Sequence, residues 1–482
     1  MNTTEYDVII IGAGPVGENV ADRVVQGGLT AAIIERELVG GECSYWACMP
    51  TKALLRDAAA LRAVQRLPGA AAAVTGDLDA KAVLARRDRF ASNWQDDGQV
   101  AWLNEAGISL VRGHGRITAP KSVSVTGEDG TELTLNARQA VVIATGTSAA
   151  LPPIAGLADV KPWTSREAVS ASTVPDRLAI IGGGVVGAEM ATAYNALGSA
   201  VTFIARDRVL PNVEPYAAEH VIASLRDRGV QVMIGAEPTK VTRNSKGTVH
   251  ISLADGAVIE ADEVLVATGR KPNTEDLGLD QIGLTSGNWL NVDDTLQLTA
   301  PDGVSTHEGW LYAAGDVNRR ALLTHQGKYQ ARALGDALVA RATGRPVDYS
   351  PWGRHASTAD ELAVAQVVFT DPEIASVGLT TKAAQAAGLQ VRIVEYDLSA
   401  VAGAALHADD YTGRASILIN ERTNTIVGFT AVGPDVSELV HAATIAIVGE
   451  IPLERLWHAV PAYPTTSEVW LRLLETAGRR SS

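Results

Sequence analysis

Residues 8–17, VIIIGAGPVG, decide the fold. The apolar, β-branched run predicts a short buried strand, and the residues after Gly17 have the pattern of a helix. Strand, G-x-G-x-x-G and helix in this order form a dinucleotide-binding fingerprint, in which Gly12 makes the turn and Gly14 lets a pyrophosphate approach the helix amino terminus. Glu35 ends the next strand-like run, TAAIIE, eighteen residues after Gly17, where an acid can hold a ribose hydroxyl. A bound dinucleotide is therefore a better interpretation than an ordinary glycine turn.

The same pattern occurs again in RLAIIGGGVVGAEMATAYNALG, residues 177–198, which the strand-like run AVTFIA follows. The positions of this second fingerprint are Gly182, Gly184, Val185, Val186 and Gly187. Ala205 stands where Glu35 stands in the first copy, and Arg206 and Arg208 come next. A missing acid beside guanidinium groups suits a ribose with an additional phosphate, as in NADP. The alternative is a solvated pair of surface arginines.

Three further segments support two nucleotide sites. Residues 140–157 and 263–273 each contain an apolar strand that ends in Ala-Thr-Gly, followed by proline-bearing, turn-like sequence. Residues 309–318, GWLYAAGDVN, read as another buried strand, and the Asp316 carboxylate after it could hold a sugar-alcohol hydroxyl. Each could be an ordinary strand end when taken singly, but their order along the chain favours two sites. Two sites of different character predict two cofactors, or a cofactor and a co-substrate, that exchange electrons.

The stretch GECSYWACMPTK, residues 41–52, holds the only two cysteines of the 482 residues. Cys43 and Cys48 lie at the start of the helical run TKALLRDAAALRAVQRL, and a helix amino terminus favours the thiolate. Pro50 suits the first turn of that helix. A pair of cysteines without nearby histidines makes a poor zinc site. The pair is redox-active or, alternatively, consists of two structural thiols.

Composition narrows the classes of function. The chain is long enough for two to four domains, and its net charge of -14 disfavours nucleic acid or an anionic membrane as the main partner. The first apolar run is too short for a membrane span and lacks the basic residues of a signal peptide. We therefore expect a cytoplasmic protein, in a reducing compartment where a structural disulfide is unfavourable.

These segments together resemble the pyridine nucleotide-disulfide oxidoreductases, the flavoprotein family of dihydrolipoamide dehydrogenase, glutathione reductase and mercuric reductase. GGECSYWACMPTK is similar to the redox motif C-x-x-x-x-C-x-P-[ST]-K of that family, residues 367–380 to the opening of its dimerisation domain, and YPTTSE, residues 463–468, to its closing motif H-P-T-x-S-E. The resemblance implies an α/β fold with two Rossmann-like dinucleotide-binding domains and an α+β dimerisation domain. The implied FAD domain comprises residues 1–150 and 272–350, the NAD(P) domain residues 151–271, and the interface domain residues 351–482.

The resemblance also implies roles for individual residues. Cys48 lies against the flavin, Cys43 exchanges with substrate, and Lys52 sits beside the flavin, paired with Glu189; an interdomain ion pair is the alternative for these last two. The implied FAD-binding residues are Gly12, Gly14, Pro15, Gly17, Glu35, Arg36, Gly41, Glu42, Lys52, Gly115, Ala144, Thr145, Gly146, Asp316 and His325. The implied NAD(P)-binding residues are Gly182, Gly184, Val185, Val186, Gly187, Glu189, Arg206, Arg208 and Gly269.

Two features depart from the family. The loop between the cysteines carries Tyr45 and Trp46, which either reshape the approach to the disulfide or fill the core. Tyr463 stands where disulfide-reducing members have a catalytic histidine, which the glutamate at Glu468 orients. A tyrosine, with an ordinary pKa near 10, is a poor base at neutral pH, and the five-residue spacing makes His458 a doubtful replacement. Mercuric reductases share the tyrosine, but with only two cysteines in the 482 residues we expect neither their carboxy-terminal cysteine pair nor their amino-terminal metal-binding domain.

The sequence thus predicts a homodimeric FAD enzyme, with an active site shared between subunits, that oxidises NADPH or, less well, NADH. The first hypothesis for its acceptor is a quinone, a metal ion such as mercuric ion, or another small electrophile. The second is dihydrolipoamide dehydrogenase or disulfide reductase activity with atypical proton handling. The third is a slow flavin-bearing redox sensor.

Overall fold

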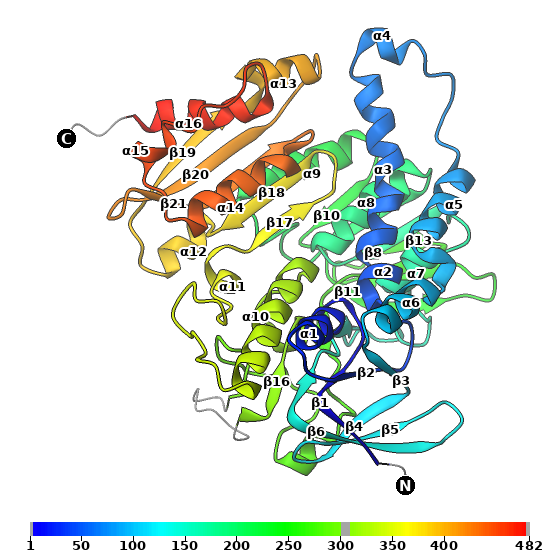
Figure 1. Cartoon of the computed structure of the whole chain (residues 1–482). Helices are drawn as coiled ribbons and strands as arrows, with labels where there is room; N and C mark the ends of the chain where they lie inside the picture. Colours follow the sequence, from blue (N-terminus) through cyan, green and yellow to red (C-terminus); the bar gives the residue numbers. More distant parts are fainter. Residues whose placement is uncertain (1–2, 300–308, 479–482) are drawn as a thin grey trace. The chain divides into compact units, whose positions relative to one another are not determined.

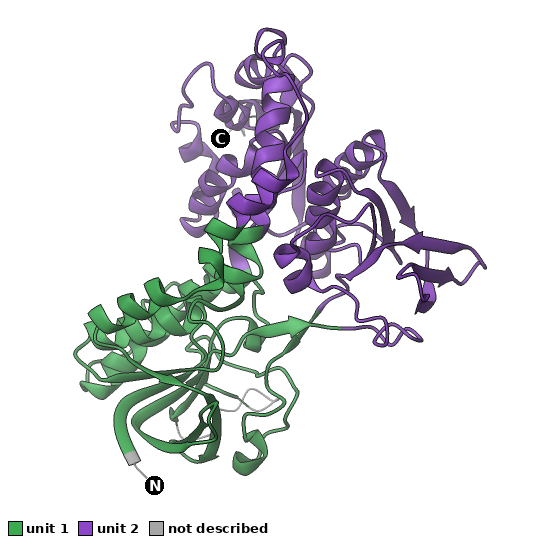
Figure 2. Ribbon diagram, turned by 90° about the vertical axis from the view of Figure 1, so that its right-hand side faces the viewer, with its two compact units in different colours: residues 1–50, 88–150, 270–361 green, residues 51–87, 151–269, 362–482 purple. Residues whose placement is uncertain are grey.

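The computed structural model describes residues 3–299 and 309–478 (Figure 1). The chain forms two compact units (Figure 2). Unit 1 comprises residues 1–50, 88–150 and 270–361, and unit 2 comprises residues 51–87, 151–269 and 362–482. The division into flavin, nicotinamide and interface domains stays a prediction.

A seven-stranded sheet forms the centre of unit 1, with the order β3-β2-β1-β6-β5-β4 and with β16 also beside β6. Its strands are β1 (Thr3–Ile11), β2 (Ala31–Glu35), β3 (Ser109–Arg112), β4 (His114–Ala119), β5 (Ser122–Thr126), β6 (Glu132–Ile143) and β16 (Leu311–Ala313). β1, β2, β3, β16 and the end of β6 run parallel. Val8, Ile9 and Ile10 are fully buried, as expected for a parallel strand that is covered on both faces.

Helices α1 (Pro15–Gln26) and α10 (Thr324–Ala342) pack against each other in unit 1 and lie side by side in Figure 1. Small residues permit this approach, because a Cβ on Gly327 would lie 2.6 Å from the Val16 side chain. The short helix α2 (Gly41–Tyr45) and α6 (Asp97–Glu105) belong to the same unit. α3 (Cys48–Gln65) begins in unit 1 and continues into unit 2, and α5 (Ala80–Phe90) returns to unit 1.

Unit 2 contains a four-stranded parallel sheet in the order β10-β9-β8-β14 and a three-stranded antiparallel sheet, β11-β12-β13. The strands are β8 (Arg177–Ile181), β9 (Ala200–Ala205), β10 (Gln231–Ile234), β11 (Pro238–Arg243), β12 (Val249–Leu253), β13 (Val258–Ala261) and β14 (Glu263–Val266). Helix α8 (Val185–Ala196) follows β8 directly and packs on β8 and β9, and α9 (Pro215–Asp227) precedes β10. This is the strand-turn-helix arrangement predicted from the second fingerprint.

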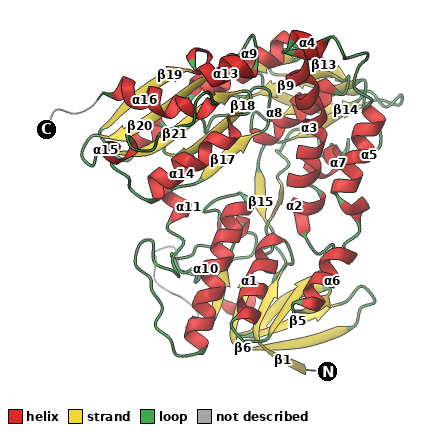
Figure 3. Cartoon of the chain, turned by 45° about the horizontal axis from the view of Figure 1, so that its top comes forward, coloured by secondary structure: helices red, strands yellow, loops and turns green. Residues whose placement is uncertain are grey.

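A five-stranded antiparallel sheet completes unit 2, in the order β17-β18-β21-β20-β19 (Figure 3). Its strands are β17 (Ala365–Val368), β18 (Glu373–Gly378), β19 (Val391–Asp397), β20 (Arg414–Asn420) and β21 (Thr425–Gly433). Helix α14 (Val440–Val448) packs against β21 and β18, and α16 (Val469–Ala477) packs against β19. The predicted α/β class is confirmed. Within residues 3–299 and 309–478, no helix is long and apolar enough to cross a membrane.

Candidate active site

The first fingerprint forms an open cradle at the start of α1. Gly12 has a φ of +105°, and a Cβ there would lie 2.5 Å from the carbonyl oxygen of Ala144, so only glycine fits this turn. A Cβ on Gly14 would have no atom within 4 Å. Gly14 is also the N-cap of α1, and no side chain caps its backbone N–H groups, while Pro15 occupies the first helical position. The loop therefore offers an approachable helix amino terminus, which suits a pyrophosphate.

Glu35 ends β2 beside this glycine loop, and its carboxylate holds the loop through hydrogen bonds. The backbone N–H of Ala13 donates to Glu35 Oε2 at 2.8 Å, and that of Glu37 donates to Oε1 at 2.8 Å. A carboxylate can accept further hydrogen bonds, so these contacts leave capacity for a ribose hydroxyl. The neighbouring Arg36 is exposed.

A second polar group in unit 1 centres on Asp316. The Thr147 hydroxyl donates to Asp316 Oδ2 at 2.9 Å, and burial raises the pKa of Asp316 above its ordinary value. The Arg270 guanidinium lies 3.9 Å from both Asp316 and Glu42. Sequence reasoning missed Arg270, although it stands directly after the Ala-Thr-Gly of the second such strand. The cradle and these carboxylates together fit a flavin dinucleotide.

Other predicted flavin residues surround the same region of unit 1. Ala144, Thr145 and Gly146 follow β6, and the Thr145 hydroxyl donates to the backbone oxygen of Asn273 at 2.8 Å. Gly115 lies on β4, where a Cβ would meet the side chain of Ile34 at 3.2 Å. His325 is exposed on the first turn of α10. Gly41 begins α2, and a Cβ on it would lie 2.9 Å from the Cα of Gly14, so the cysteine loop approaches the start of α1 closely.

The two thiols lie on neighbouring helices and are not bonded to each other. Cys43 lies in α2, and Cys48 is the first residue of α3. Cys48 Sγ is 3.3 Å from the Thr324 hydroxyl oxygen on α10, a residue 276 positions away. Hydrogen bonding to Cys48 and burial both raise the pKa of the Cys43 thiol. Thr324 is a second residue that sequence reasoning missed, because nothing local marks it.

The two aromatics of the cysteine loop differ. Tyr45 is 1 % exposed, and its hydroxyl donates to the backbone oxygen of Val39 at 3.0 Å. Burial raises the pKa of Tyr45 to about 12. Trp46 is half-buried, with its ring centroid 5.6 Å from that of Tyr45. Tyr45 therefore fills the core and does not reshape the approach to the thiols. Its hydroxyl anchors the cysteine loop.

Lys52 and Glu189 meet in unit 2. Lys52 Nζ lies 2.8 Å from Glu189 Oε2, and the Glu189 side chain is almost fully buried. The backbone N–H of Phe369 donates to the other carboxylate oxygen at 3.0 Å, and the lysine ammonium lies 5.0 Å from the centroid of the Phe369 ring. The buried acid is thus fully paired and fixes the lysine head group in one position.

The second fingerprint repeats the first cradle. Gly182 has a φ of +124°, Gly187 packs on the strand, and a Cβ on Gly184 would meet nothing closer than 3.9 Å. Val185 begins α8, and Val186 is exposed. Gly269 follows β14 with a φ of +154°. These positions fit a pyridine dinucleotide.

The residues that follow β9 bear on the choice between NADP and NAD. Ala205 is fully buried at the end of that strand. Arg206 and Arg208 are exposed, and Arg206 Nε lies 3.1 Å from Asp207 Oδ2. This ion pair is on the surface, so it holds the guanidinium only weakly.

The closing segment presents Tyr463 outward. Its side chain is 75 % exposed, and His458 is exposed as well. Glu468 is buried and pairs with Arg472 one turn along, but its Oε2 atom is buried without a hydrogen-bond partner among the described residues. The predicted approach of Tyr463 to Cys43 of a partner subunit stays a prediction.

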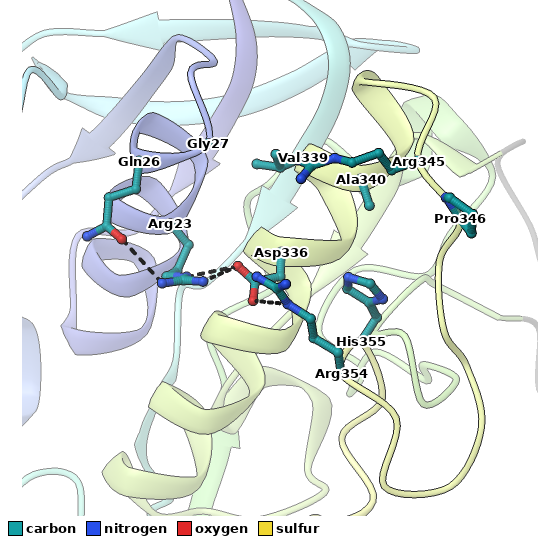
Figure 4. Close-up of a pocket in the computed structure, with 10 residues that line it drawn as sticks. All are labelled: Arg23, Gln26, Gly27, Asp336, Val339, Ala340, Arg345, Pro346, Arg354 and His355. Carbon is teal, nitrogen blue, oxygen red and sulfur yellow. Dashed lines mark hydrogen bonds and ion pairs between the residues drawn. The ribbon is translucent and has the colours of Figure 1, made fainter.

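A cavity of about 310 Å³ lies between the carboxy-terminal halves of α1 and α10 (Figure 4). Its wall includes Arg23 and Arg354, which both pair with Asp336, and also Arg345 and His355. None of the residues predicted from the sequence to bind a cofactor lines this cavity. It is therefore separate from the candidate active site.

Comparison with known proteins agrees with this geometry. Residues 6–340 match the family pyridine nucleotide-disulphide oxidoreductase, and residues 364–473 match the dimerisation domain of that family. Mercuric reductase of Staphylococcus aureus is 31 % identical over 468 residues, which cover 96 % of this chain and 81 % of that protein. Dihydrolipoyl dehydrogenase of Chlamydia pneumoniae is 31 % identical over 477 residues, covering 97 % and 96 %.

Two solved structures share the fold. LpdA from Mycobacterium tuberculosis superimposes with a TM-score of 0.82 at 26 % identity, covering 99 % of this chain and 100 % of that one. The HOCl-induced flavoprotein disulfide reductase RclA from Escherichia coli, in its Cu(II) complex, gives a TM-score of 0.82 at 24 % identity, covering 98 % and 99 %.

Proposed function

This chain belongs to the pyridine nucleotide-disulphide oxidoreductase family, and from that membership we propose the reaction that it catalyses. As a member it is a flavoprotein oxidoreductase that uses FAD and a pyridine nucleotide and carries a dimerisation domain. We propose that it is a homodimer that oxidises NADPH in preference to NADH. Its Cys43–Cys48 pair is redox-active, and the enzyme delivers electrons to a quinone, a metal ion or another small electrophilic acceptor.

FAD, when bound, supplies the hydride-accepting chemistry, and the protein supplies orientation and charge. Gly12, Gly14 and the amino terminus of α1 would hold the pyrophosphate, and Glu35 and Asp316 would hold sugar hydroxyls. Cys48 stands at the first position of α3, where a helix amino terminus favours a thiolate, and its Sγ lies 3.3 Å from the Thr324 hydroxyl oxygen. The Lys52 ammonium, held by Glu189, keeps a fixed positive charge in unit 2.

The acceptor proposal depends most on Tyr463. A dithiol or disulfide substrate requires a base that takes a thiol proton, and a phenol is a poor base at neutral pH. The exposed Tyr463, and Glu468 Oε2 with no hydrogen-bond partner in residues 3–299 and 309–478, support a reaction in which that base is not needed. Similarity to a mercuric reductase, at 31 % identity, supports a metal ion as the acceptor. Similarity to dihydrolipoyl dehydrogenases supports dithiol oxidation as the alternative.

A screen of electron acceptors tests this proposal. Purified holoenzyme is supplied with NADPH and, in turn, with a soluble quinone, mercuric ion, oxidised lipoamide and glutathione disulfide. We expect turnover with the quinone or with mercuric ion, and at most slow turnover with the two disulfides. Fast reduction of lipoamide or glutathione disulfide would favour the alternative. A stable long-wavelength absorbance without turnover of any acceptor would indicate a sensor.

A further inference from the structure

The short turn that carries Asp316, residues 315–318, is held by a buried glutamine of α10. Gln330 is fully buried, and its Oε1 atom accepts a hydrogen bond from the backbone N–H of Gly315 at 2.7 Å. The same oxygen accepts a second hydrogen bond from Asn318 Nδ2 at 2.9 Å. These two donors stand on either side of Asp316 in the chain. One side-chain oxygen therefore fixes both ends of the turn.

The other end of the Gln330 amide is fixed by Asp360. Gln330 Nε2 donates to Asp360 Oδ2 at 2.8 Å. The Asp360 side chain is fully buried on the short helix α11 (Ala359–Leu362), which lies beside α10 in Figure 1. A backbone N–H can only donate, so the Gln330 oxygen must face Gly315 and the amide nitrogen must face Asp360. The carboxylate thus holds the buried amide in the orientation that the turn requires.

Asp360 also holds a second glutamine, which does not reach the turn. Gln326 lies one helical turn before Gln330 on α10, and its Nε2 donates to Asp360 Oδ1 at 3.2 Å. In the part of the chain that the structure describes, no hydrogen bond joins Gln326 to residues 315–318. Arg320 Nε lies 3.5 Å from Asp360 Oδ2 and balances the buried charge. The chain therefore offers two glutamines on one carboxylate, of which only one contacts the turn.

The turn also packs against the glycine loop that is proposed to hold the pyrophosphate. Gly315 has a φ of +80°, and a Cβ on it would lie 2.8 Å from the Val16 side chain at the start of α1. A Cβ on Gly327 of α10 would lie 2.6 Å from the same side chain and 3.3 Å from the Cα of Gly315. The turn, α1 and α10 are thus in van der Waals contact. A shift of the turn would change the position of Asp316 relative to the glycine loop.

We propose that Gln330 and Asp360 are positioning residues for the flavin dinucleotide, which hold the 315–318 turn so that Asp316 presents its carboxylate to a sugar hydroxyl. This inference rests on the proposed role of Asp316 in holding that hydroxyl. Both side chains are fully buried within the protein, so they act on the cofactor through the turn. A buried carboxylate has a desolvation cost that an apolar side chain would avoid, and here it secures the direction of one amide.

The experiment measures how fast flavin leaves the holoenzyme. Each purified holoenzyme is washed on an ultrafiltration membrane, and the flavin absorbance of the filtrate gives the rate of release. Gln330→Met removes the amide at nearly constant size, and Asp360→Leu removes its acceptor. Gln326→Met is the matched control, because it removes the other amide from the same carboxylate.

We expect Gln330→Met and Asp360→Leu each to speed flavin release by about fivefold to a hundredfold, because each leaves a buried N–H group near the turn without its acceptor. Gln326→Met should leave the release rate close to that of the wild type. Because Gln330 acts through Asp316, Gln330→Met should add little to the release that Asp316→Ala already causes. Loss of stability alone would instead give similar release from both methionine variants.

An exchange of polarity tests whether hydrogen bonding, and not packing, carries the effect. Gln330→Glu alone sets two carboxylates against each other and should speed release. Combined with Asp360→Asn, the new carboxylate can accept from Gly315 and Asn318, and the new amide can donate to it and accept from Gln326. The paired exchange should therefore restore flavin retention to near the wild-type rate.

Equal release from Gln330→Met and Gln326→Met would overturn the proposal, and so would fast release from the paired exchange. If Gln330→Met or Asp360→Leu does not fold, the paired exchange decides, because it leaves no buried polar group of the network without a partner. Fast release from Asp316→Ala with wild-type release from Gln330→Met would refute this inference and leave the role of Asp316 intact. Slow release from Asp316→Ala would refute that role as well. The readout does not depend on any acceptor, so a failed acceptor screen would refute only the proposed function.

Discussion

Tyr463 presents its phenol to solvent at the position where the disulfide-reducing relatives of this chain place a histidine base. Glu468, which would orient that base, keeps a buried oxygen without a partner among the described residues. We therefore predict that Tyr463→His creates or raises activity with dihydrolipoamide, because a general base typically contributes about 10²- to 10⁴-fold. Steady-state assays with dihydrolipoamide and with a quinone measure the change, and Tyr463→Phe is the matched control. Strong wild-type dihydrolipoamide activity that the histidine does not improve would contradict this reading.

The two cysteines should give opposite spectra when each is replaced. The family resemblance implies that the Cys48 thiolate is the one against the flavin, and Cys48 stands at the start of α3 beside the Thr324 hydroxyl. Cys48→Ser should abolish the long-wavelength absorbance that follows two-electron reduction. Cys43→Ser should show that absorbance without reduction, because Cys48 is then a permanent thiol. Identical spectra for both variants would refute the assigned roles.

Nucleotide preference should reside in the two exposed arginines after β9. Arg206 is held only by a surface ion pair with Asp207, so its guanidinium can turn to a phosphate at little cost. Replacing both Arg206 and Arg208 with alanine should remove most of the preference for NADPH over NADH, a discrimination of roughly 1 to 3 kcal/mol. The ratio of kcat/KM for the two nucleotides measures it. Arg226→Ala, in the last turn of α9, is the control. A wild-type preference for NADH would refute the assignment.

At the scale of elements, Asp371 joins three parts of unit 2. It is buried in the turn between β17 and β18 and forms ion pairs with Arg62, Arg66 and Arg228, which belong to or directly follow α3 and α9. The backbone oxygen of Asp371 also accepts a hydrogen bond from the Ser224 hydroxyl at 2.6 Å. Burial opposes ionisation of Asp371, but the three arginines outweigh it and lower its pKa below the ordinary value.

We predict that Asp371→Asn lowers the free energy of unfolding by about 3 to 5 kcal/mol, because it leaves three half-buried guanidinium groups without their buried counter-charge. Urea unfolding at pH 7 measures the loss, and Asp255→Asn, in an exposed turn before β13, is the control. The wild-type pKa of Asp371 is lowered, so its contribution is present above the ordinary value of 3.8 and is lost as pH falls below it. The variants should therefore converge toward the wild type in strong acid. Equal midpoints for Asp371→Asn and Asp255→Asn would refute the role of this cluster.

At the scale of the whole molecule, the matched dimerisation domain carries large apolar side chains that the single chain leaves exposed. Ile445 on α14 is 54 % exposed, and Val460 is 82 % exposed three residues before Tyr463. The family expectation is that a second copy of the chain covers exposed apolar side chains of this domain. Dimer assembly and the placement of the closing motif, residues 463–468, would then depend on the same segment of the chain.

We predict that Ile445→Glu with Val460→Glu converts a dimer into a monomer, because burying two carboxylates in an apolar interface is unfavourable. Light scattering coupled to size exclusion measures the mass. Val258→Glu, at an exposed valine on β13, is the control. The monomer should retain FAD but should lose the turnover in which electrons leave the enzyme through the thiols. A monomeric wild-type protein, or full turnover in the monomeric variant, would contradict a shared active site.

The sequence by itself determined the features that depend on neighbouring residues. Both glycine fingerprints, with β1 before α1 and β8 before α8, follow from hydrophobic period and from the turns that only glycine permits. The start of α3 at Cys48 follows from the same local rules. The local sequence is sufficient for these elements because their hydrogen bonds and turns form between residues that are close along the chain. A motif of about thirty residues therefore contains all the information that they require.

The tertiary structure alone decided which distant groups share one environment. It brings Thr324 to Cys48 across 276 residues and buries Tyr45 under the cysteine loop. It also gathers three arginines around Asp371. Local pattern cannot supply these facts, because burial and the distance between charges are properties of packed elements that the chain connects only through long loops. Those two quantities set the pKa values of the acids and thiols, and hence the chemistry that the site can perform.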